Sequence, residues 1–234
     1  MHRGRSLRSV RTVLLDLDGT LVDSARTITE HLAAALAEVG FPVPPADTLR
    51  RLVGPPFETA LPELGLTDEQ TSAAITAYRS SYDAVAATVT PVYPGVPALL
   101  ERLRESGLQL AVATSKPEEL ARKIVAGTGL AGFLEVVGGA DHVGGRVGKA
   151  AVVGSVIERL GVDPARQPVV MVGDRHHDVD GAEAHGIPAI GVAWGYAEPG
   201  ELDGARLVVT DLEDLAQALR GDEVWSTLPP DTRN

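Results

Sequence analysis

The apolar residues in most of the chain fall into short continuous runs that alternate with segments of helical spacing. Short runs of this kind are typical of strands buried on both faces of a parallel sheet. We expect strands at 12–16, 109–113, 134–137, 168–173, 187–192 and 207–210. Helices are expected at 96–106, 117–127, 149–160, 179–185 and 212–219. This alternation predicts an α/β fold with a doubly wound parallel sheet.

Residues 24–90 interrupt the alternation directly after the first expected strand, and their pattern is helical. Helices are expected at 24–39 and 47–53, and the sequence from Thr67 to Gln70 has the spacing of a capping box that opens a helix reaching about Ala87. We therefore predict a Rossmann-like core formed by residues 10–23 and 92–220, with residues 24–91 inserted as a helical cap. Residues 1–9 and 221–234 are expected to be disordered tails.

Composition narrows the functional classes. The chain has 21 basic and 32 acidic residues and a net charge of −11, which argues against nucleic acid or an anionic membrane as a partner. Because there is no cysteine, disulfides, thiolate metal sites and thiol nucleophiles are excluded. No apolar run approaches the length of a membrane-spanning helix. We expect a cytoplasmic protein that acts as a monomer or a homodimer.

Polar residues of the types used in phosphoryl transfer follow several of the expected strands. Alone, each aspartate is typical of a turn or helix cap, and a lone lysine is typical of a solvated surface. Together and in this order they predict a site at the carboxyl ends of the strands, where ligands bind in open α/β sheets. The residues are Asp16, Asp18, Gly19, Thr114, Ser115, Lys149, Asp174 and Asp178.

The chain resembles the haloacid dehalogenase-like hydrolase superfamily over about residues 10–220. Its four motifs are matched in order by Asp16-Leu17-Asp18-Gly19-Thr20, Thr114-Ser115, Lys149, and the stretch from Gly173 to Asp178. The insert at 24–91 lies where that family carries its helical C1 cap. The segments 172–182, 186–188, 194–196 and, in the cap, 53–56 are similar to the phosphoglycolate phosphatase and 5′-nucleotidase-like branch.

The resemblance implies a Mg²⁺-dependent phosphatase acting on a small phosphorylated metabolite. Asp16 would attack phosphorus to give an aspartyl-phosphate, and Asp18 would serve first as general acid and then as general base. Lys149 would hold Asp16 and the transferring phosphoryl group. The metal would be bound by Asp16, Asp174 and the backbone carbonyl of Asp18.

The resemblance also implies a phosphate cradle formed by Thr114, Ser115 and the N–H groups near Asp18 and Gly19. Asp178 would orient the metal-site loop from behind the ligands, or simply start a helix. Phosphoglycolate and a nucleoside monophosphate are the candidate substrates.

Several other activities compete with this one. Dehalogenation is disfavoured by Asp18, since a halide leaving group needs no proton. A P-loop kinase is disfavoured because the spacing from Gly144 to Lys149 is one residue short and Ala150 replaces the hydroxyl ligand. A phosphomutase or phosphotransferase, including protein-tyrosine phosphoryl transfer, stays open, as does a non-catalytic phosphate-binding regulatory module.

Other residues carry weaker signals. His176 and His177 suggest zinc, which would need a third clustered ligand, so an exposed histidine pair is the preferred interpretation. Trp194 and Tyr196 are expected to anchor a loop or to pack in the core. Lys116 lies close to the expected phosphate loop. The cap residues that could contact a leaving group are Arg26, Arg50, Arg51, Glu58, Arg79 and Tyr82, with Arg50 and Arg51 preferred because they adjoin the Gly-Pro-Pro turn.

Overall fold

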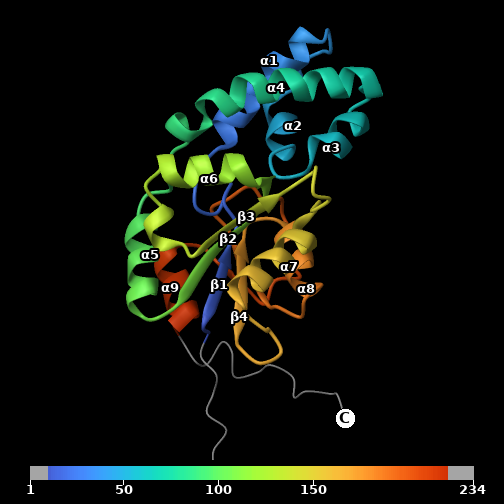
Figure 1. The fold of residues 1–234 in the computed structure, drawn as a ribbon. Helices are drawn as coiled ribbons and strands as arrows, with labels where there is room; N and C mark the ends of the chain where they lie inside the picture. The colour runs from blue at the N-terminus through green and yellow to red at the C-terminus, as the bar shows by residue number, and fades with distance from the viewer. Residues whose placement is uncertain (1–9, 221–234) are drawn as a thin grey trace, which may run out of the picture.

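A computed structural model describes residues 10–220 and places six parallel strands in one sheet at the centre of the fold (Figure 1). Their order across the sheet is β3-β2-β1-β4-β5-β6. The strands are β1 Thr12–Leu15, β2 Gln109–Pro117, β3 Val136–Ala140, β4 Val169–Gly173, β5 Ala189–Val192 and β6 Leu207–Val209. The chain winds outward from β1 to β3 and then, on the other side of β1, from β4 to β6. The doubly wound parallel sheet is therefore confirmed.

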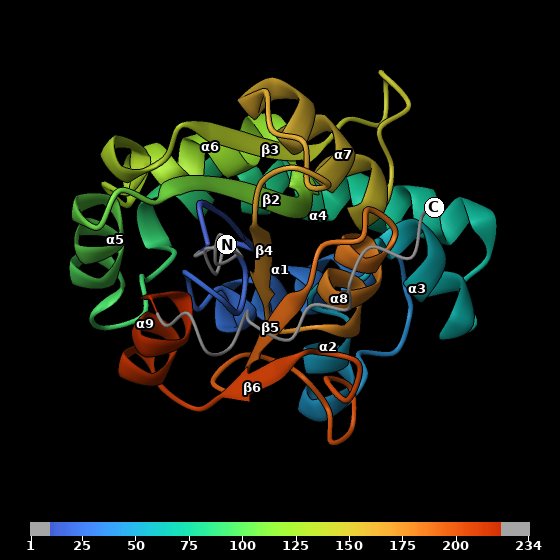
Figure 2. The same ribbon diagram turned by 90° about the horizontal axis from the view of Figure 1, so that it is seen from below.

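Helices cover both faces of this sheet (Figure 2). They are α5 Val96–Glu105, α6 Glu118–Gly127, α7 Lys149–Leu160, α8 His176–Glu183 and α9 Leu212–Arg220. Leu14 of β1 packs in the apolar layer that includes α7 and α8, whereas Val13 and Leu15 pack in the layer that includes α5, α6 and α9. Because both faces of β1 are buried, its sequence is a continuous apolar run with no alternation.

Four helices lie beyond the carboxyl ends of the strands, at the top of the view in Figure 1. They are α1 Ala25–Glu38, α2 Ala46–Arg51, α3 Phe57–Glu63 and α4 Asp68–Val89. Val22 and Val92 form an antiparallel bridge, and the N–H of Asp23 donates to the carbonyl of Pro91 at 2.9 Å. The chain thus leaves and re-enters the core along two adjacent segments, next to the predicted limits of the cap. None of the helices within residues 10–220 is long and apolar enough to cross a membrane.

The long helix α4 begins where its capping box predicts. The hydroxyl of Thr67 accepts a hydrogen bond from the N–H of Gln70 at 3.2 Å, and the side-chain oxygen of Gln70 accepts one from the N–H of Thr67 at 3.2 Å. These contacts satisfy two N–H groups that a helix start otherwise leaves unpaired. The start of α4 is therefore fixed by local hydrogen bonds.

The structure adds one helix and corrects the bounds of three expected elements. Helix α3 was not expected, because the Gly54-Pro55-Pro56 segment suggests a break, yet Pro56 precedes the first turn, where its missing N–H costs nothing. Strand β3 lies at Val136–Ala140 instead of 134–137, and β2 continues to Pro117. Helix α8 begins at His176, three residues before the expected start, because the side chain of Asp178 accepts the N–H of Arg175 and caps the first turn. The predicted tails, 1–9 and 221–234, lie outside the described residues.

Candidate active site

Three carboxylates meet where the strand order of the sheet reverses. Asp16 follows β1 and Asp174 follows the adjacent strand β4, whose Val172 pairs with Leu15. Asp178 lies in the first turn of α8. One carboxylate oxygen from each aspartate lies within 4.8 Å of the other two, and all three residues are buried. Ligands of doubly wound sheets bind at this reversal of strand order.

Asp174 is held by two donors from other loops. Its Oδ2 accepts the N–H of Tyr196 at 2.7 Å, and its Oδ1 accepts the hydroxyl of Thr20 at 3.3 Å. Burial raises the pKa of Asp174 well above its ordinary value, and the carboxylates of Asp178 and Asp16 raise it further. Buried carboxylates this close repel one another unless a cation offsets their charge, and carboxylate oxygens are the ligands that Mg²⁺ prefers. The cluster therefore fits a divalent cation.

Gly19 makes room for this cluster. Its φ of 82° is left-handed, and a Cβ at this position would lie 2.1 Å from Oδ2 of Asp174. The N–H of Gly19, which we expected to face a phosphate, donates instead to the carbonyl of Val22 at 2.8 Å. In this conformation a glycine is needed at position 19 because Asp174 approaches so closely. Its N–H is not available to bind a phosphate.

Lys149, the first residue of α7, places its ammonium group between two of the carboxylates. Its Nζ lies 2.9 Å from Oδ1 of Asp16 and 2.7 Å from Oδ1 of Asp178, and it donates to the carbonyl of Ala113 at 3.0 Å. The side chain is only 4% exposed. Burial by itself would lower the pKa of Lys149, but the carboxylates of Asp16 and Asp178 outweigh it and raise the pKa. Lys149 is thus a buried cation fixed against Asp16.

Asp178 caps the start of α8, one of the two functions that the sequence left as alternatives, and it also pairs with Lys149. One oxygen pairs with Lys149, and the other accepts the N–H of Arg175 at 3.0 Å and so caps α8. Burial raises the pKa of Asp178 to about 6, although the Lys149 ammonium opposes that rise. Both oxygens are engaged by protein groups, so this carboxylate supports the cluster from behind Asp16.

A small cavity of about 30 Å³ brings most of the predicted site residues together. Thr114 and Ser115 reach it from the end of β2, and Gly54 reaches it from the loop between α2 and α3. The other predicted residues along its wall are Asp16, Asp18, Lys149 and Asp178. The cavity is thus bounded by strand ends below and by a loop of the inserted helices above.

Residues 13–192 match the haloacid dehalogenase-like hydrolase family. The chain belongs to this family. Among its relatives, tyrosine-protein kinase PtkA of Mycobacterium tuberculosis is 41% identical over 215 residues, covering 90% of this chain and 73% of PtkA. The plasmid-encoded phosphoglycolate phosphatase of Cupriavidus necator is 36% identical over 219 residues, covering 88% of this chain and 92% of that protein.

A solved structure shares the whole fold of this haloacid dehalogenase-like protein. The crystal structure of a predicted phosphatase from Clostridium acetobutylicum matches with a TM-score of 0.83 and 33% identity, covering 90% of this chain and 98% of that one. Together these comparisons confirm the predicted superfamily, its α/β fold and the predicted enzyme class, a phosphatase of the haloacid dehalogenase-like type.

Asp18 pairs with Lys116, a residue to which the sequence analysis assigned no function. The Nζ of Lys116 lies 3.1 Å from Oδ2 of Asp18 and donates to the hydroxyl of Tyr82 on α4 at 3.1 Å. The same ammonium lies 4.7 Å from the centre of the Tyr82 ring. The other oxygen of Asp18, Oδ1, is buried and has no hydrogen-bond partner among the described residues. A cap helix is thereby linked to Asp18 through one lysine.

The two preferred cap arginines of this haloacid dehalogenase-like hydrolase do not line the small cavity that contains Asp16. Arg50 lies over the ring of Tyr196, 5.1 Å from its centre, and contacts the carbonyl of Gly195 at 3.5 Å. Arg51 donates to the hydroxyl of Thr48 at 3.2 Å. Arg50 therefore fastens α2 to the core, and this arrangement gives neither arginine the expected contact with a leaving group.

Arg175 makes a further contact between core and cap, which the sequence analysis missed. Its guanidinium donates to the carbonyl of Val53 and pairs with Glu201 at 2.6 Å. Glu201 also accepts the ring Nδ1 of His176 at 2.7 Å. Glu201 is thus the third clustered group that a zinc site with His176 and His177 would need, but its carboxylate is already paired with the Arg175 cation, which repels a metal ion.

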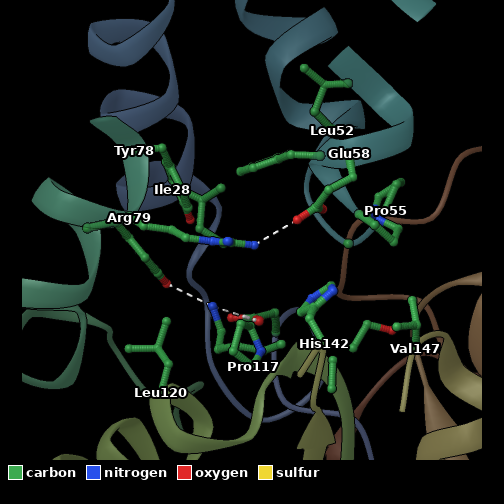
Figure 3. A pocket seen from close by; sticks show the side chains of 18 of the residues that line it. Ile28, Leu52, Pro55, Glu58, Tyr78, Arg79, Pro117, Leu120, His142 and Val147 are labelled. Carbon is green, nitrogen blue, oxygen red and sulfur yellow. Dashed lines mark hydrogen bonds and ion pairs between the residues drawn. The ribbon is translucent and has the colours of Figure 1, made fainter. Parts of the chain in front are cut away.

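A larger cavity, about 110 Å³, lies between the cap helices and the strand ends (Figure 3). Asp18, Gly54, Ser115 and Lys116 line both this cavity and the smaller one, so the two adjoin. Three of the cap residues named from the sequence line it, namely Glu58, Arg79 and Tyr82. A fourth, Arg26, lies elsewhere on an exposed face and pairs with Glu30.

Proposed function

We propose that this chain is a Mg²⁺-dependent phosphatase that hydrolyses a small phosphomonoester through an aspartyl-phosphate on Asp16. The observation that carries the proposal is the buried ion pair between Lys149 and Asp16, 2.9 Å long, at the wall of the cavity that Thr114 and Ser115 also line. An ammonium at this position offsets the charge of a carboxylate that approaches an anionic phosphoryl group. Phosphoglycolate and nucleoside monophosphates are the candidate substrates.

In the first step an oxygen of Asp16 attacks phosphorus, and the bond between phosphorus and the leaving oxygen breaks. Asp18 donates a proton to that oxygen, so the leaving group departs as a neutral hydroxyl. The unpartnered Oδ1 of Asp18 is free to carry this proton, while Oδ2 is held by Lys116. Thr114 and Ser115 would bind the oxygens of the transferring group.

In the second step water attacks the phosphorus of the aspartyl-phosphate. Asp18, now a carboxylate, takes a proton from that water, and the bond between phosphorus and the Asp16 oxygen breaks. Inorganic phosphate is released and Asp16 returns as a carboxylate. Lys149 stays in contact with Asp16 throughout and holds its orientation.

Asp16, Asp174 and the backbone carbonyl of Asp18 would hold the Mg²⁺ ion. When bound, the ion supplies positive charge beside the nucleophile and the phosphoryl oxygens. The three crowded carboxylates support this assignment, since the pKa of Asp174 is raised by burial and by its two neighbours. Asp178 is occupied by Lys149 and by the N–H of Arg175, which supports a positioning role for it.

The test is hydrolysis of p-nitrophenyl phosphate with and without Mg²⁺ by the wild type and by Asp16→Asn. The variant is expected to lose all turnover above background, and the wild type is expected to lose it when the metal is chelated. Asp180→Asn, an exposed position on α8, is the matched control and should retain full activity. Undiminished turnover by Asp16→Asn would remove the nucleophile assignment.

Transfer of the phosphoryl group to a hydroxyl other than water is the second candidate, as in a phosphotransferase or phosphomutase. It is favoured by the 41% identity to a protein named a tyrosine-protein kinase. The two outcomes are separated by measuring released phosphate and released leaving group in one reaction. Equal amounts indicate hydrolysis, whereas a deficit of free phosphate in the presence of an acceptor hydroxyl indicates transfer.

A further inference from the structure

The larger cavity is the space into which the leaving group of a substrate extends, if Asp16 is the nucleophile as proposed above. Asp18 lines both cavities, and its carboxylate would meet the leaving oxygen. Ser115 and Gly54 also line both cavities, so a substituent on that oxygen would extend past them into the space under the cap. The walls of this cavity therefore determine which leaving groups the enzyme accepts.

Those walls are mainly apolar. Ile28, Leu52, Phe57, Tyr78 and Leu120 contribute side chains from α1, from the α2–α3 segment, from α4 and from α6. Figure 3 shows Ile28, Leu52 and Tyr78 on the cap side and Leu120 on the core side of the same space. Phe57 and Tyr78 meet edge to face, with ring centres 4.9 Å apart. Such walls favour an apolar or aromatic substituent.

The charged groups of the cavity leave no surplus cation. Arg79 pairs with Glu58 at 2.7 Å, a contact drawn as a dashed line in Figure 3, and Lys116 pairs with Asp18 at 3.1 Å. Asp83 adds one more carboxylate to the lining. Among the described residues the lining therefore holds three carboxylates against one guanidinium and one ammonium, besides the imidazole of His142.

Binding of a substrate with a second anionic group would be unfavourable, because every cation in the lining is already paired with a carboxylate. A carboxylate such as that of phosphoglycolate would have to displace Glu58 from Arg79 or Asp18 from Lys116, and an additional carboxylate would remain close by. A neutral group faces neither cost. We propose that this phosphatase selects phosphomonoesters whose leaving group is uncharged and largely apolar, and that it discriminates against substrates with a second anionic group, which disfavours phosphoglycolate among the candidate substrates named above.

The test compares substrates of equal size that differ in charge. One pair is phosphoglycolate and phosphoglycolamide, and the other is 4-carboxyphenyl and 4-carbamoylphenyl phosphate. At pH 8, where histidine side chains are in general uncharged, the amide of each pair is expected to have about a tenfold higher kcat/KM, as one unfavourable charge contact predicts. Along ethyl, butyl and hexyl phosphate, whose leaving groups have similar basicity, kcat/KM is expected to rise.

Variants identify the groups responsible. Glu58→Gln releases Arg79 and is expected to raise kcat/KM for the anionic member of each pair relative to the amide, so that the wild-type preference for the amide shrinks. Asp83→Asn should act in the same direction. Glu63→Gln, exposed on the same helix as Glu58 and outside the cavity lining, is the matched control and should change neither. A wild-type preference for the anionic member that disappears in Arg79→Gln would overturn the proposal, because Arg79 would then be an anion-binding group.

Binding to Asp16→Asn, measured by calorimetry with Mg²⁺ present, separates this inference from the proposed function. If the wild type hydrolyses none of the four esters, the proposed function fails, but the binding preference can still be read. Tighter binding of the amide supports the inference. Tighter binding of the carboxylate, or binding of neither member, overturns it whatever the outcome for hydrolysis.

Discussion

The ammonium of Lys116 lies 3.1 Å from the Asp18 carboxylate, and the same nitrogen donates to Tyr82 of the cap at 3.1 Å. The Lys116 side chain is 6% exposed, so water screens this ion pair weakly. Burial by itself would lower the pKa of Lys116, but Asp18 first and then the tyrosines raise it, and the group remains a cation. The proposed acid–base residue is therefore positioned by a lysine whose own position depends on the cap.

Replacement of Lys116 by methionine is expected to affect substrates according to their leaving groups. An alkyl phosphate needs a proton on its leaving oxygen, and general acid catalysis contributes about 10²–10⁴-fold to such steps. p-Nitrophenolate leaves readily without a proton. We therefore expect Lys116→Met to lower kcat by about 100-fold for butyl phosphate and much less for p-nitrophenyl phosphate.

Lys123→Met is the matched control for this experiment, because Lys123 is an exposed lysine that pairs only with Glu119 on its own helix among the described residues. Its activity on both substrates should match the wild type. Tyr82→Phe keeps the ring and removes the hydroxyl, so it should show a weaker version of the Lys116→Met pattern. Equal losses on the two substrates in Lys116→Met would indicate a general structural defect and contradict the positioning role.

The Lys149 ion pairs predict a large effect on stability. Lys149→Met leaves Asp16 and Asp178 buried without their cation, and breaking a buried pair in this way costs about 3–5 kcal/mol. We expect a decrease of this size in the free energy of unfolding, measured by urea denaturation in EDTA. Adding Asp178→Asn to Lys149→Met removes one of the two orphaned charges and should restore part of the loss. If Lys149→Met is as stable as the wild type, the buried pairs do not contribute as proposed.

Much of the core could be predicted because its determinants are local in sequence. The runs in β1 and β4 are apolar at every position, since both faces of those strands are covered, and the Thr67–Gln70 capping box specifies the start of α4 within four residues. Asp16 and Asp174 could be placed together because parallel strands end at one edge of a sheet. Helix α3 was missed because Pro56 indicates a break in isolation, whereas the structure uses it before a first turn.

The contacts between core and cap could not be predicted, because they depend on how the two pack. Lys116 reaches Tyr82, 34 positions away, and Arg175 reaches Val53, 122 positions away. No spacing or periodicity relates these residues. Arg50 was preferred as a substrate contact because it adjoins the Gly-Pro-Pro turn, yet its guanidinium rests on Tyr196 of a core loop. The position of Arg50 beside the Gly-Pro-Pro turn in the sequence therefore did not determine where its side chain points.

The carboxylate cluster predicts how stability depends on pH in metal-free protein. The pKa of Asp178 is raised to about 6 in the folded state, above the value of an unfolded aspartate, so the folded state binds the proton more tightly. Its contribution to stability is therefore fully present at low pH and is lost as pH rises through about 6. In EDTA, the unfolding free energy of the wild type minus that of Asp178→Asn should increase as pH falls from 7.5 to 5.

Taking this difference cancels groups that titrate in the same range independently of Asp178, such as His177, whose pKa is lowered chiefly by burial. Saturating Mg²⁺ should reduce the slope, since a cation in the cluster favours the ionised carboxylates. A difference that stays constant with pH, or that grows as pH rises, would show that Asp178 does not carry the proton in the folded state.

Gly19→Ala tests whether the close approach to Asp174 shapes the metal site. The new Cβ would lie 2.1 Å from Oδ2 of Asp174, so the carboxylate or the loop has to shift. Asp174 is a proposed metal ligand, and even the loss of a partner that only orients such a ligand weakens metal affinity about 10–100-fold. We expect that loss in a Mg²⁺ titration of activity, together with a large fall in kcat.

Gly40→Ala separates crowding from backbone strain, because Gly40 has a similar positive φ of 71° and nothing within 4 Å of its added Cβ. Both variants should lose about 1 kcal/mol of stability from the left-handed backbone, but only Gly19→Ala should lose affinity for Mg²⁺. If the two variants respond alike to Mg²⁺, the glycine is needed only for its φ, and the contact with Asp174 does not shape the site.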